Sequence, residues 1–354
     1  MKIVVVTDAW VPQVNGVVRT LQATRRELER CGLAVAMITP QSFVTVPCPG
    51  YPEIRLALAP YRRLARMLTA ELAHDGDVAI HIATEGPFGR AARRFCLRRR
   101  LQFTTAYHTR YPQYLRAMFG VPEVWTYGAL RRFHSASALV MAPTASVEQE
   151  LRTIGIERVG RWTRGVDAEV FRPTEPMPLD VPKPIFAYVG RVSVEKNIEA
   201  FLQLDLPGTK VVAGDGPALD RLRRRHDDAL FLGMLDSAQL ARLYSAANAF
   251  VFPSRTDTFG LVLLEALACG LPVAAYPVQG PLDVVGGAEV AVLDEDLRRA
   301  ALGALRIDRA RCREFAMQRS WRTSARQFVS LLRPTLAGRC ANRACEVDTP
   351  TVRT

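Results

Sequence analysis

Several features that define common classes of protein are missing from the 354 residues. No apolar run approaches the roughly 20 uncharged residues that a membrane-spanning helix needs. The apolar run at the start, from Ile3 to Val6, meets Asp8 and has no small-residue cleavage site after it. It therefore predicts a buried strand rather than a signal sequence. We expect a cytoplasmic protein that stays on one side of any membrane.

The sequence also lacks the usual patterns of metal, dinucleotide and nucleic-acid sites. Its seven cysteines are odd in number and follow no zinc spacing, which indicates reduced, structural thiols. No G-x-G-x-x-G follows the first strand, and this excludes a dinucleotide-dependent oxidoreductase. Helix-turn-helix, zinc-finger and RNA-recognition signatures are missing as well, so we expect no nucleic-acid partner.

Charge is not balanced. The chain has 47 Lys and Arg against 35 Asp and Glu, which gives a net charge of +12. This excess predicts an anionic partner, such as a phosphorylated substrate or an acidic lipid surface. The charge alone does not choose between them.

Short apolar runs rich in β-branched residues alternate with longer amphipathic stretches. Five strand-like runs occupy the first half and five the second: residues 2–8, 33–40, 78–84, 103–109 and 138–144, then 184–190, 210–216, 229–233, 249–254 and 272–277. Helical patterns lie between most of them. Continuous apolar strands that alternate with helices predict an α/β fold with parallel sheets covered on both faces.

The two series are separated by residues 174–184, which hold four prolines and little periodicity. We expect this segment to link two doubly wound, Rossmann-like domains, residues 1–173 and 185–310, that face each other across a cleft. Residues 310–333 have the pattern of one amphipathic helix, and we expect segment 311–335 to pack back towards the first domain. The polar tail, residues 336–354, is expected to be disordered.

Two loops of the second half carry groups suited to a diphosphate. In open parallel sheets, ligands bind beyond the carboxyl ends of the strands. Gly190 ends one strand and leaves room, and Arg191 and Lys196 follow five residues apart around a turn. Two such cations suit a diphosphate clamp, although two unrelated surface cations are the alternative. Gly214 lies in a tight turn after the next strand and allows close backbone approach.

A third loop, SRTDTFGLVLLEA at residues 254–266, places two acids beside an apolar helix. Phe259, Gly260 and Leu261 begin this predicted helix, whose free N–H groups favour a phosphate. Glu265 lies roughly one and a half turns further along and is placed to bind a ribose diol. Asp257 is placed to bind the hydroxyls of a sugar. The alternative is that Asp257 only caps the helix.

Taken together, GR-x4-K, GDGP and SRTDTFGLVLLEA resemble the motifs of glycosyltransferase family four, whose members are retaining enzymes with the GT-B fold. The resemblance covers nearly the whole chain. NGVVRT at residues 15–20 is similar to the family's N-terminal loop, YHT at 107–109 to its strand-end histidine, and RGVD at 164–167 to the segment that closes the first domain. The family more often has Glu where this chain has Asp257.

The resemblance implies a UDP- or GDP-linked sugar as the donor. Arg191 and Lys196 would neutralise its diphosphate as it leaves, with help from the N–H groups of Gly260, Leu261 and Val262. Glu265 would bind the ribose. No cofactor and no metal is implied.

The resemblance also implies the catalytic arrangement. Asp257 would hold the donor sugar, and Gly16 would approach the diphosphate and the reacting sugar. His108 would contact the sugar near its anomeric centre and stabilise developing positive charge. The departing phosphate oxygen would accept the proton of the acceptor, so that no protein nucleophile is required.

One acidic triplet could be mistaken for a metal site. Asp294-Glu295-Asp296 matches the metal-binding DxD of the other glycosyltransferase fold. Because LRRAAL follows directly, we interpret the triplet as the cap of the next helix.

Basic residues gather in the first domain, where the acceptor is expected to bind. Residues 90–100 as a helix place five arginines on one side, and residues 61–68 place Arg62, Arg63 and Arg66 opposite two leucines. Aromatic residues follow between 107 and 133. This combination suits a peripheral enzyme on the anionic inner face of the cell membrane, with a solvated helix face as the alternative.

The motifs NGVVRT and TDTFGLVLLEA are similar to those of bacterial GDP-mannose-dependent mannosyltransferases and of synthases that add sugars to diacylglycerol. We therefore expect a retaining hexosyltransferase of glycolipid synthesis, with diacylglycerol as the favoured acceptor. The first alternative is a GDP-mannose-dependent α-mannosyltransferase acting on a glycan or another lipid. A sugar-nucleotide epimerase is the second, and it would need more acid/base groups. A non-enzymatic basic binding protein would tolerate the loss of Asp257 and Glu265.

Overall fold

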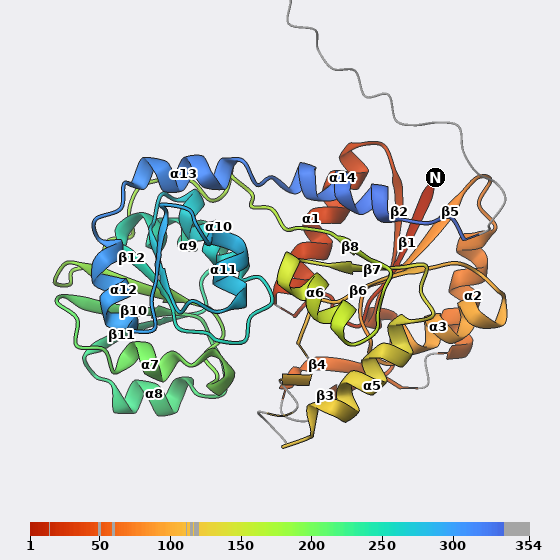
Figure 1. The fold of residues 1–354 in the computed structure, drawn as a ribbon, viewed down its shortest axis with the longest axis horizontal. Coiled ribbons are helices and arrows are strands. Elements are labelled where there is room, and N and C mark those ends of the chain that lie inside the picture. Colours follow the sequence, from red (N-terminus) through yellow and green to blue (C-terminus); the bar gives the residue numbers. More distant parts are fainter. Residues whose placement is uncertain are drawn as a thin grey trace, which may run out of the picture.

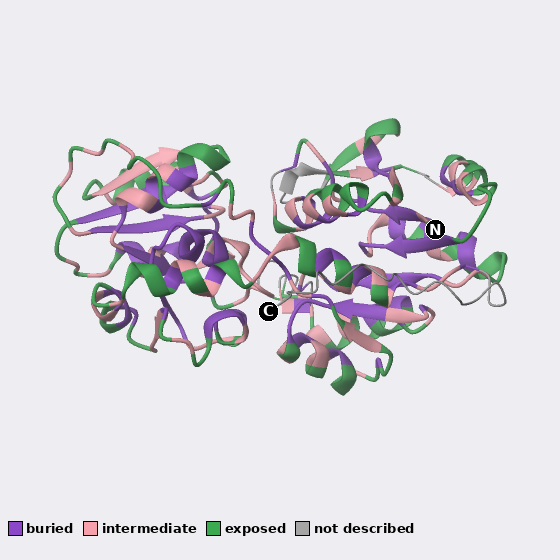
Figure 2. Ribbon diagram, turned by 90° about the horizontal axis from the view of Figure 1, so that it is seen from above, coloured by how far each residue is buried: buried purple, intermediate pink, exposed green. Residues whose placement is uncertain are grey.

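The computed structural model describes residues 1–13, 15–48, 51–58, 61–110, 112–113, 116 and 120–335, and the expected disordered tail lies outside these residues. The chain forms two lobes, each built around one parallel sheet (Figure 1). Buried residues concentrate in the sheets and on the helix faces against them (Figure 2). No helix in the described ranges is both long and apolar enough to cross a membrane.

The N-terminal domain has a six-stranded parallel sheet in the order β2-β1-β5-β6-β7-β8. Its strands are β1 (Lys2–Val6), β2 (Ala34–Ile38), β5 (Val78–Ile82), β6 (Thr104–Ala106), β7 (Leu139–Ala142) and β8 (Val159–Arg161). The antiparallel hairpin of β3 (Thr45–Cys48) and β4 (Tyr51–Ala57) stands apart from this sheet. The helices are α1 (Gly16–Arg30), η1 (Pro40–Ser42), α2 (Tyr61–Leu72), α3 (Pro87–Arg98), α5 (Glu123–His134) and α6 (Ala145–Thr153).

The C-terminal domain repeats this plan with the strand order β11-β10-β9-β12-β13-β14. Its strands are β9 (Ile185–Val189), β10 (Thr209–Ala213), β11 (Ala229–Gly233), β12 (Ala249–Phe252), β13 (Val273–Ala275) and β14 (Ala291–Leu293). Its helices are η2 (Val194–Lys196), α7 (Ile198–Leu202), α8 (Leu219–Arg225), α9 (Ser237–Ala246), α10 (Leu261–Ala268), α11 (Gln279–Val285), α12 (Leu297–Ala304) and α13 (Arg309–Met317). The last helix, α14 (Trp321–Leu331), returns to the N-terminal domain.

All ten predicted strands are present, so the α/β prediction is confirmed. Two edge strands, β8 and β14, were not predicted, and each has only three residues. The β3–β4 hairpin was not predicted either. Three residues show too little apolar alternation to be recognised, and edge strands bury less of their surface. The buried thiols Cys96, Cys269 and Cys312 are free, as expected, and burial raises the pKa of each to about 12.

The prediction of a single helix over 310–333 is wrong, because the chain breaks into α13 and α14 at residues 318–320. The side chain of Ser320 accepts the N–H of Thr323 and caps α14. Cys312 and Ala316 of α13 are buried in the core of the C-terminal domain, whereas Phe328 of α14 is buried in that of the N-terminal domain. The two helices therefore pack on different domains (Figure 1).

Candidate active site

The loops predicted to bind the donor all follow the carboxyl ends of adjacent strands. Gly190 follows β9, Gly214 follows β10, and the loop of Asp257 follows β12. Because β9 lies between the other two strands, the three loops lie side by side. The amide of Asn197 donates to the carbonyl of Pro253 at 3.1 Å, which ties the first loop to the third.

Two glycines let the first two loops approach closely. Gly214 has a φ of +138°, and a Cβ added there would lie 1.8 Å from the carbonyl oxygen of Gly190. The N–H of Gly190 in turn donates to the carbonyl of Ala213 at 3.0 Å. A side chain at Gly214 would therefore displace the strand end that carries Arg191.

Lys196 and Asp257, which come from different loops, are in direct contact. Lys196 Nζ lies 2.5 Å from Asp257 Oδ1, and both side chains are largely buried. The other oxygen, Oδ2, is buried and has no hydrogen-bond partner among the described residues. The structure thus joins the expected diphosphate cation to the expected sugar acid, an ion pair that the sequence did not indicate.

The start of α10 faces the N-terminal domain. Gly260 adopts a φ of +80° at the helix N-cap, a left-handed conformation that favours glycine. The first N–H groups of a helix have no partner within the helix, and those of Leu261 and Val262 are in this position. Opposite them, Gly16 begins α1, and a Cβ at Gly16 would lie 3.8 Å from Leu261 Cδ1. Phe259 and Val262 pack against the core beneath.

His108 follows β6 and is held from behind by an arginine. The guanidinium of Arg164 donates to His108 Nδ1 at 3.1 Å and to the carbonyl of Trp162 at 2.6 Å. Since a guanidinium only donates, Nδ1 is the acceptor and the proton of the neutral ring lies on Nε2. Burial, then Arg164 and His81, lowers the pKa of His108 well below its usual value. A neutral ring next to a cation favours hydrogen bonding by this side chain over stabilisation of positive charge, and its catalytic role stays a prediction.

Glu265 is buried on α10 and is held by the opposite domain. Its Oε1 accepts from the guanidinium of Arg19 on α1 at 2.7 Å. Oε2 is buried with no hydrogen-bond partner in the described part of the chain. The structure thus connects the expected ribose-binding residue to the N-terminal domain.

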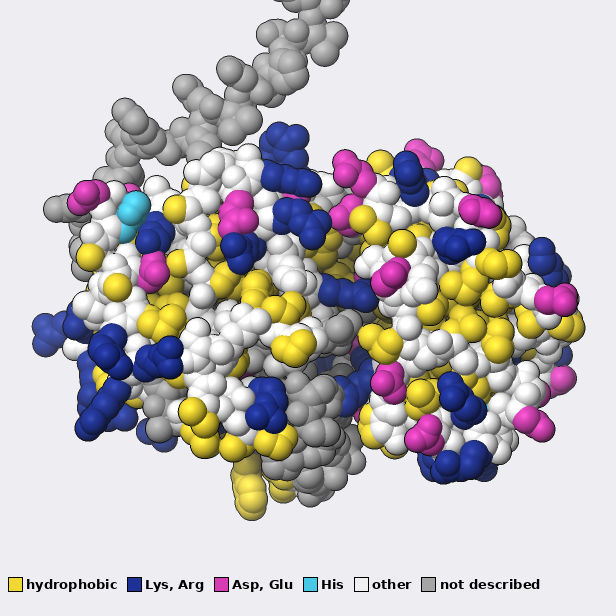
Figure 3. Space-filling view, turned by 180° about the vertical axis from the view of Figure 1, so that it is seen from behind, with side chains coloured by type: hydrophobic (Ala, Val, Ile, Leu, Met, Phe, Trp, Pro, Cys, Tyr) yellow, Lys and Arg dark blue, Asp and Glu magenta, His cyan; other side chains and the backbone are white. Residues whose placement is uncertain are grey.

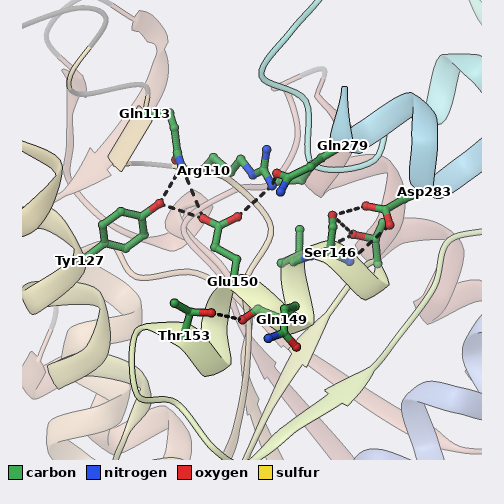
Figure 4. A network of polar contacts seen from close by, with 12 residues as sticks. Arg110, Gln113, Tyr127, Ser146, Gln149, Glu150, Thr153, Gln279 and Asp283 are labelled. Atoms are coloured by element: carbon green, nitrogen blue, oxygen red, sulfur yellow. Dashed lines mark hydrogen bonds and ion pairs between the residues drawn. The ribbon is translucent and has the colours of Figure 1, made fainter. Parts of the chain in front are cut away.

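Two further contacts join the domains beside these groups. The Thr258 hydroxyl donates to the carbonyl of His108 at 2.9 Å. Arg110, four residues after β6, is bonded to Gln279 of α11 and lies 2.8 Å from Glu150 of α6 (Figure 4). The predicted residues of both domains are therefore brought to one interface.

Arg19 and Arg164 lie in the motifs NGVVRT and RGVD, but no role was predicted for either residue. One signal was available for Arg19. A cation near the N-terminus of a helix is unfavourable because it opposes the helix dipole, so an arginine there indicates an acidic partner elsewhere in the chain. Arg164 had no comparable signal, because its partners come from other parts of the chain.

The acidic triplet is a helix cap, as predicted. The Asp296 side chain accepts the N–H of Arg299 and caps α12. Asp294 is bonded by the Arg299 guanidinium at 2.5 and 2.6 Å, and these bonds lower its pKa. The described residues contain no group of three or more His, Cys, Asp or Glu placed to hold a metal.

Two sequence families match the chain in tandem. Residues 14–170 match Glycosyltransferase Family 4, and residues 174–309 match Glycosyl transferases group 1. Sucrose-phosphate synthase from Thermosynechococcus elongatus has the same fold, with a TM-score of 0.74 and 22% identity over 93% of this chain and 98% of that one. The fold and the site define a glycosyltransferase of the GT-B fold with a nucleotide-sugar donor. Within that class, the chain belongs to glycosyltransferase family four.

Three relatives share much of its length. The sulfoquinovosyl transferase SQD2 of Arabidopsis thaliana is 29% identical over 77% of this chain, which spans only 58% of that protein. A GDP-mannose-dependent alpha-mannosyltransferase of Mycobacterium tuberculosis is 29% identical over 80% of this chain and 81% of that one. The alpha-monoglucosyldiacylglycerol synthase of Streptococcus pneumoniae is 26% identical over 78% and 71%.

Proposed function

We propose that the chain is a retaining hexosyltransferase that moves a sugar from a UDP- or GDP-linked donor to a membrane lipid, with diacylglycerol as the favoured acceptor. One observation carries the proposal. Lys196, Asp257 and the start of α10 meet at adjacent strand ends, directly opposite Gly16 and His108 of the other domain. Sugar transfer needs groups for a diphosphate and for a donor sugar on one side of a cleft, with space for an acceptor on the other side.

In this proposal, Arg191 and Lys196 neutralise the leaving diphosphate, together with the N–H groups at the start of α10. Lys196 exchanges its bond with Asp257 for a phosphate oxygen. Asp257 then accepts hydrogen bonds from the donor sugar, beginning with the buried Oδ2. Two cations and a helix terminus supply the charge stabilisation, so we expect activity to persist in EDTA. Loss of activity in EDTA that added Mg²⁺ or Mn²⁺ restores would contradict this part.

His108 has a positioning role in this scheme. Its Nε2 is buried without a partner among the described residues and carries the proton of the neutral ring. It therefore donates a hydrogen bond to a hydroxyl of the donor sugar and fixes the sugar's orientation. The acceptor hydroxyl attacks from the face of the departing phosphate oxygen, which takes its proton, and no protein nucleophile takes part.

The lipid acceptor is supported by one end of the N-terminal domain. In α2 and α3 most apolar residues are buried and most arginines are exposed, although Leu97 is exposed and Arg93 donates to carbonyls of α5. Figure 3 shows basic side chains gathered at the lower left, over this end of the domain. Large apolar side chains are exposed on the hairpin and on α5: Val44 at 75%, Leu58 at 52%, Val124 at 74% and Trp125 at 71%. Arginines beside exposed apolar groups suit a peripheral position on an anionic membrane.

The relatives support two candidate functions. An alpha-monoglucosyldiacylglycerol synthase is among them, and a lipid product agrees with the exposed apolar side chains. A GDP-mannose-dependent mannosyltransferase matches a larger share of its own length than the plant relative does, so mannosyl transfer to a glycan or another lipid is the second candidate.

The test is a panel of UDP- and GDP-sugars incubated with diacylglycerol in anionic vesicles, extracted lipids or soluble glycans, with products read by mass spectrometry. We expect a glycosylated lipid with the anomeric configuration of the donor. Lys196→Ala should reduce turnover at least tenfold. A soluble mannosylated glycan would favour the second candidate, and epimerised donor without transfer would favour an epimerase.

The membrane contact is tested separately by vesicle sedimentation. Trp125→Ser should weaken binding to vesicles rich in phosphatidylglycerol, and salt should weaken the binding of the wild type. Met317→Ser is the control, because Met317 is 51% exposed on α13 of the other domain. Equal binding of both variants, or binding that salt does not change, would contradict the membrane contact.

A further inference from the structure

Arg19 is a cation of one domain that is bonded to a buried acid of the other. It lies near the start of α1, and its Nη1 is 2.7 Å from Oε1 of Glu265 on α10. The two residues are 246 positions apart in the chain. Glu265 is 6% exposed, and the Arg19 side chain is 31% exposed. The ion pair exists only while the domains are in contact at this place.

The surroundings of Glu265 oppose its charge unless Arg19 is present. Burial raises the pKa of Glu265, whereas Arg19, by its charge and its hydrogen bond, and to a smaller extent the Tyr244 phenol counteract this. The other titratable groups beside the carboxylate are the Tyr244 phenol of α9 and the Cys269 thiol at the end of α10. Neither group supplies positive charge. Arg19 is therefore the cation beside this carboxylate and contributes most to favouring its ionised form.

The bond to Arg19 leaves half of the carboxylate available. Oε1 is engaged, whereas Oε2 is buried without a hydrogen-bond partner among the described residues. A buried carboxylate oxygen without a donor is unfavourable and would gain from one. A ribose hydroxyl supplies such a donor.

We propose that Arg19 is a positioning residue for the donor nucleotide: it fixes Glu265 through Oε1 as a carboxylate and directs Oε2 to the ribose. This inference rests on the proposed function, since it takes a nucleotide sugar as the ligand. Because Arg19 belongs to the N-terminal domain, the ribose site of the C-terminal domain is complete only when the domains meet. Donor binding and domain contact therefore support each other.

The alternative is that Arg19 only stabilises the contact between the domains. The two roles differ in their pH dependence. Without Arg19, the pKa of Glu265 lies higher, so the carboxylate is lost at a higher pH as the pH falls. Nucleotide affinity should then decrease between pH 8 and pH 6 in the variant and change less in the wild type. A purely structural role would lower affinity equally at each pH.

The experiment is calorimetric titration of the full chain with UDP and with GDP at pH 8, 7 and 6. Arg19→Gln should weaken binding about tenfold or more at pH 8, the scale of a hydrogen bond to a charged group, and further at pH 6. Arg19→Lys should restore most of the affinity. Arg25→Gln is the matched control, because it removes an exposed ion pair with Glu29 on the same helix. Combining Arg19→Gln with Glu265→Gln should cost little beyond Glu265→Gln alone.

Three negative results have different meanings. If the wild type binds a nucleotide and Arg19→Gln binds it equally well at every pH, the inference about Arg19 is overturned and the proposed function stands. A uniform loss of affinity at all three pH values also overturns it, in favour of a structural role. If the folded wild type binds neither nucleotide, the proposed function is overturned and the inference with it.

Discussion

Gly214→Ala tests whether the close approach of two loops sets the geometry of the donor site. The added Cβ would lie 1.8 Å from the carbonyl oxygen of Gly190. Carbon and oxygen atoms in close contact are about 3.3 Å apart, so the loops would have to separate by about 1.5 Å. Arg191 follows Gly190 directly and would move with it. Since a displacement of about 1 Å can cost about 100-fold in rate, we expect kcat/KM for the donor to fall by roughly that factor, about 2.7 kcal/mol.

The left-handed backbone alone also has a cost, which a second variant measures. Gly287 has a φ of +76°, and a Cβ there would meet nothing within 4 Å. Gly287→Ala therefore carries the conformational strain, of order 1–3 kcal/mol in stability, without the collision. Steady-state kinetics, nucleotide titration and thermal melting of both variants separate the two effects. If Gly214→Ala keeps kcat/KM within about threefold of the wild type, the close approach does not set the geometry of the site.

Two further predictions concern buried charge. Arg164→Gln should move the acidic limb of the pH–rate profile to higher pH, because the Arg164 charge helps to lower the pKa of His108. The control is Arg161→Gln, which removes an exposed ion pair and should leave the profile unchanged. An unchanged profile would show that the charge of Arg164 does not influence activity through the pKa of His108. Burial also lowers the pKa of His81 to about 3, so the unfolded chain binds a proton below pH 6.5 that the native chain does not. The native state should thus lose roughly 2.3 kcal/mol of stability between pH 6.5 and pH 4.5 through this group. Urea unfolding of His81→Phe should show a correspondingly weaker loss, with the exposed His74→Gln as control.

The sequence predicted those parts of the site that depend on local geometry. Gly190, Gly214 and Gly260 could be placed because strand ends, tight turns and helix starts have recognisable residues. The rule that ligands bind at the carboxyl ends of parallel strands then brought the three loops to one edge. Their order in the sheet was not predicted, although it is the position of β9 between β10 and β12 that puts Lys196 against Asp257.

The contacts between domains could not be predicted in this way. Arg19 and Glu265 each fit a local explanation, the first as a cation on a helix and the second as an acid that binds ribose. Nothing in the sequence of either segment indicates that the two residues are in contact. The break in the helix before α14 could not be predicted for the same reason. Residues 318–320 interrupt the helix because its two halves pack on different domains, and periodicity within the segment does not show this.

Charge pairing within the site indicates how a donor would be selected. Lys196 lies against Asp257, Arg19 against Glu265, and Arg110 against Glu150, so three cations at the domain interface already have a carboxylate partner. An anion that offers only negative charge would have to break such a pair and leave a buried acid without a partner, which is costly. A nucleotide sugar offers a phosphate to the cation and hydroxyl donors to the acid at the same time. We therefore expect the exchange to be balanced only for a ligand that carries both groups at the right separation, so that the ion pairs discriminate against simple phosphates.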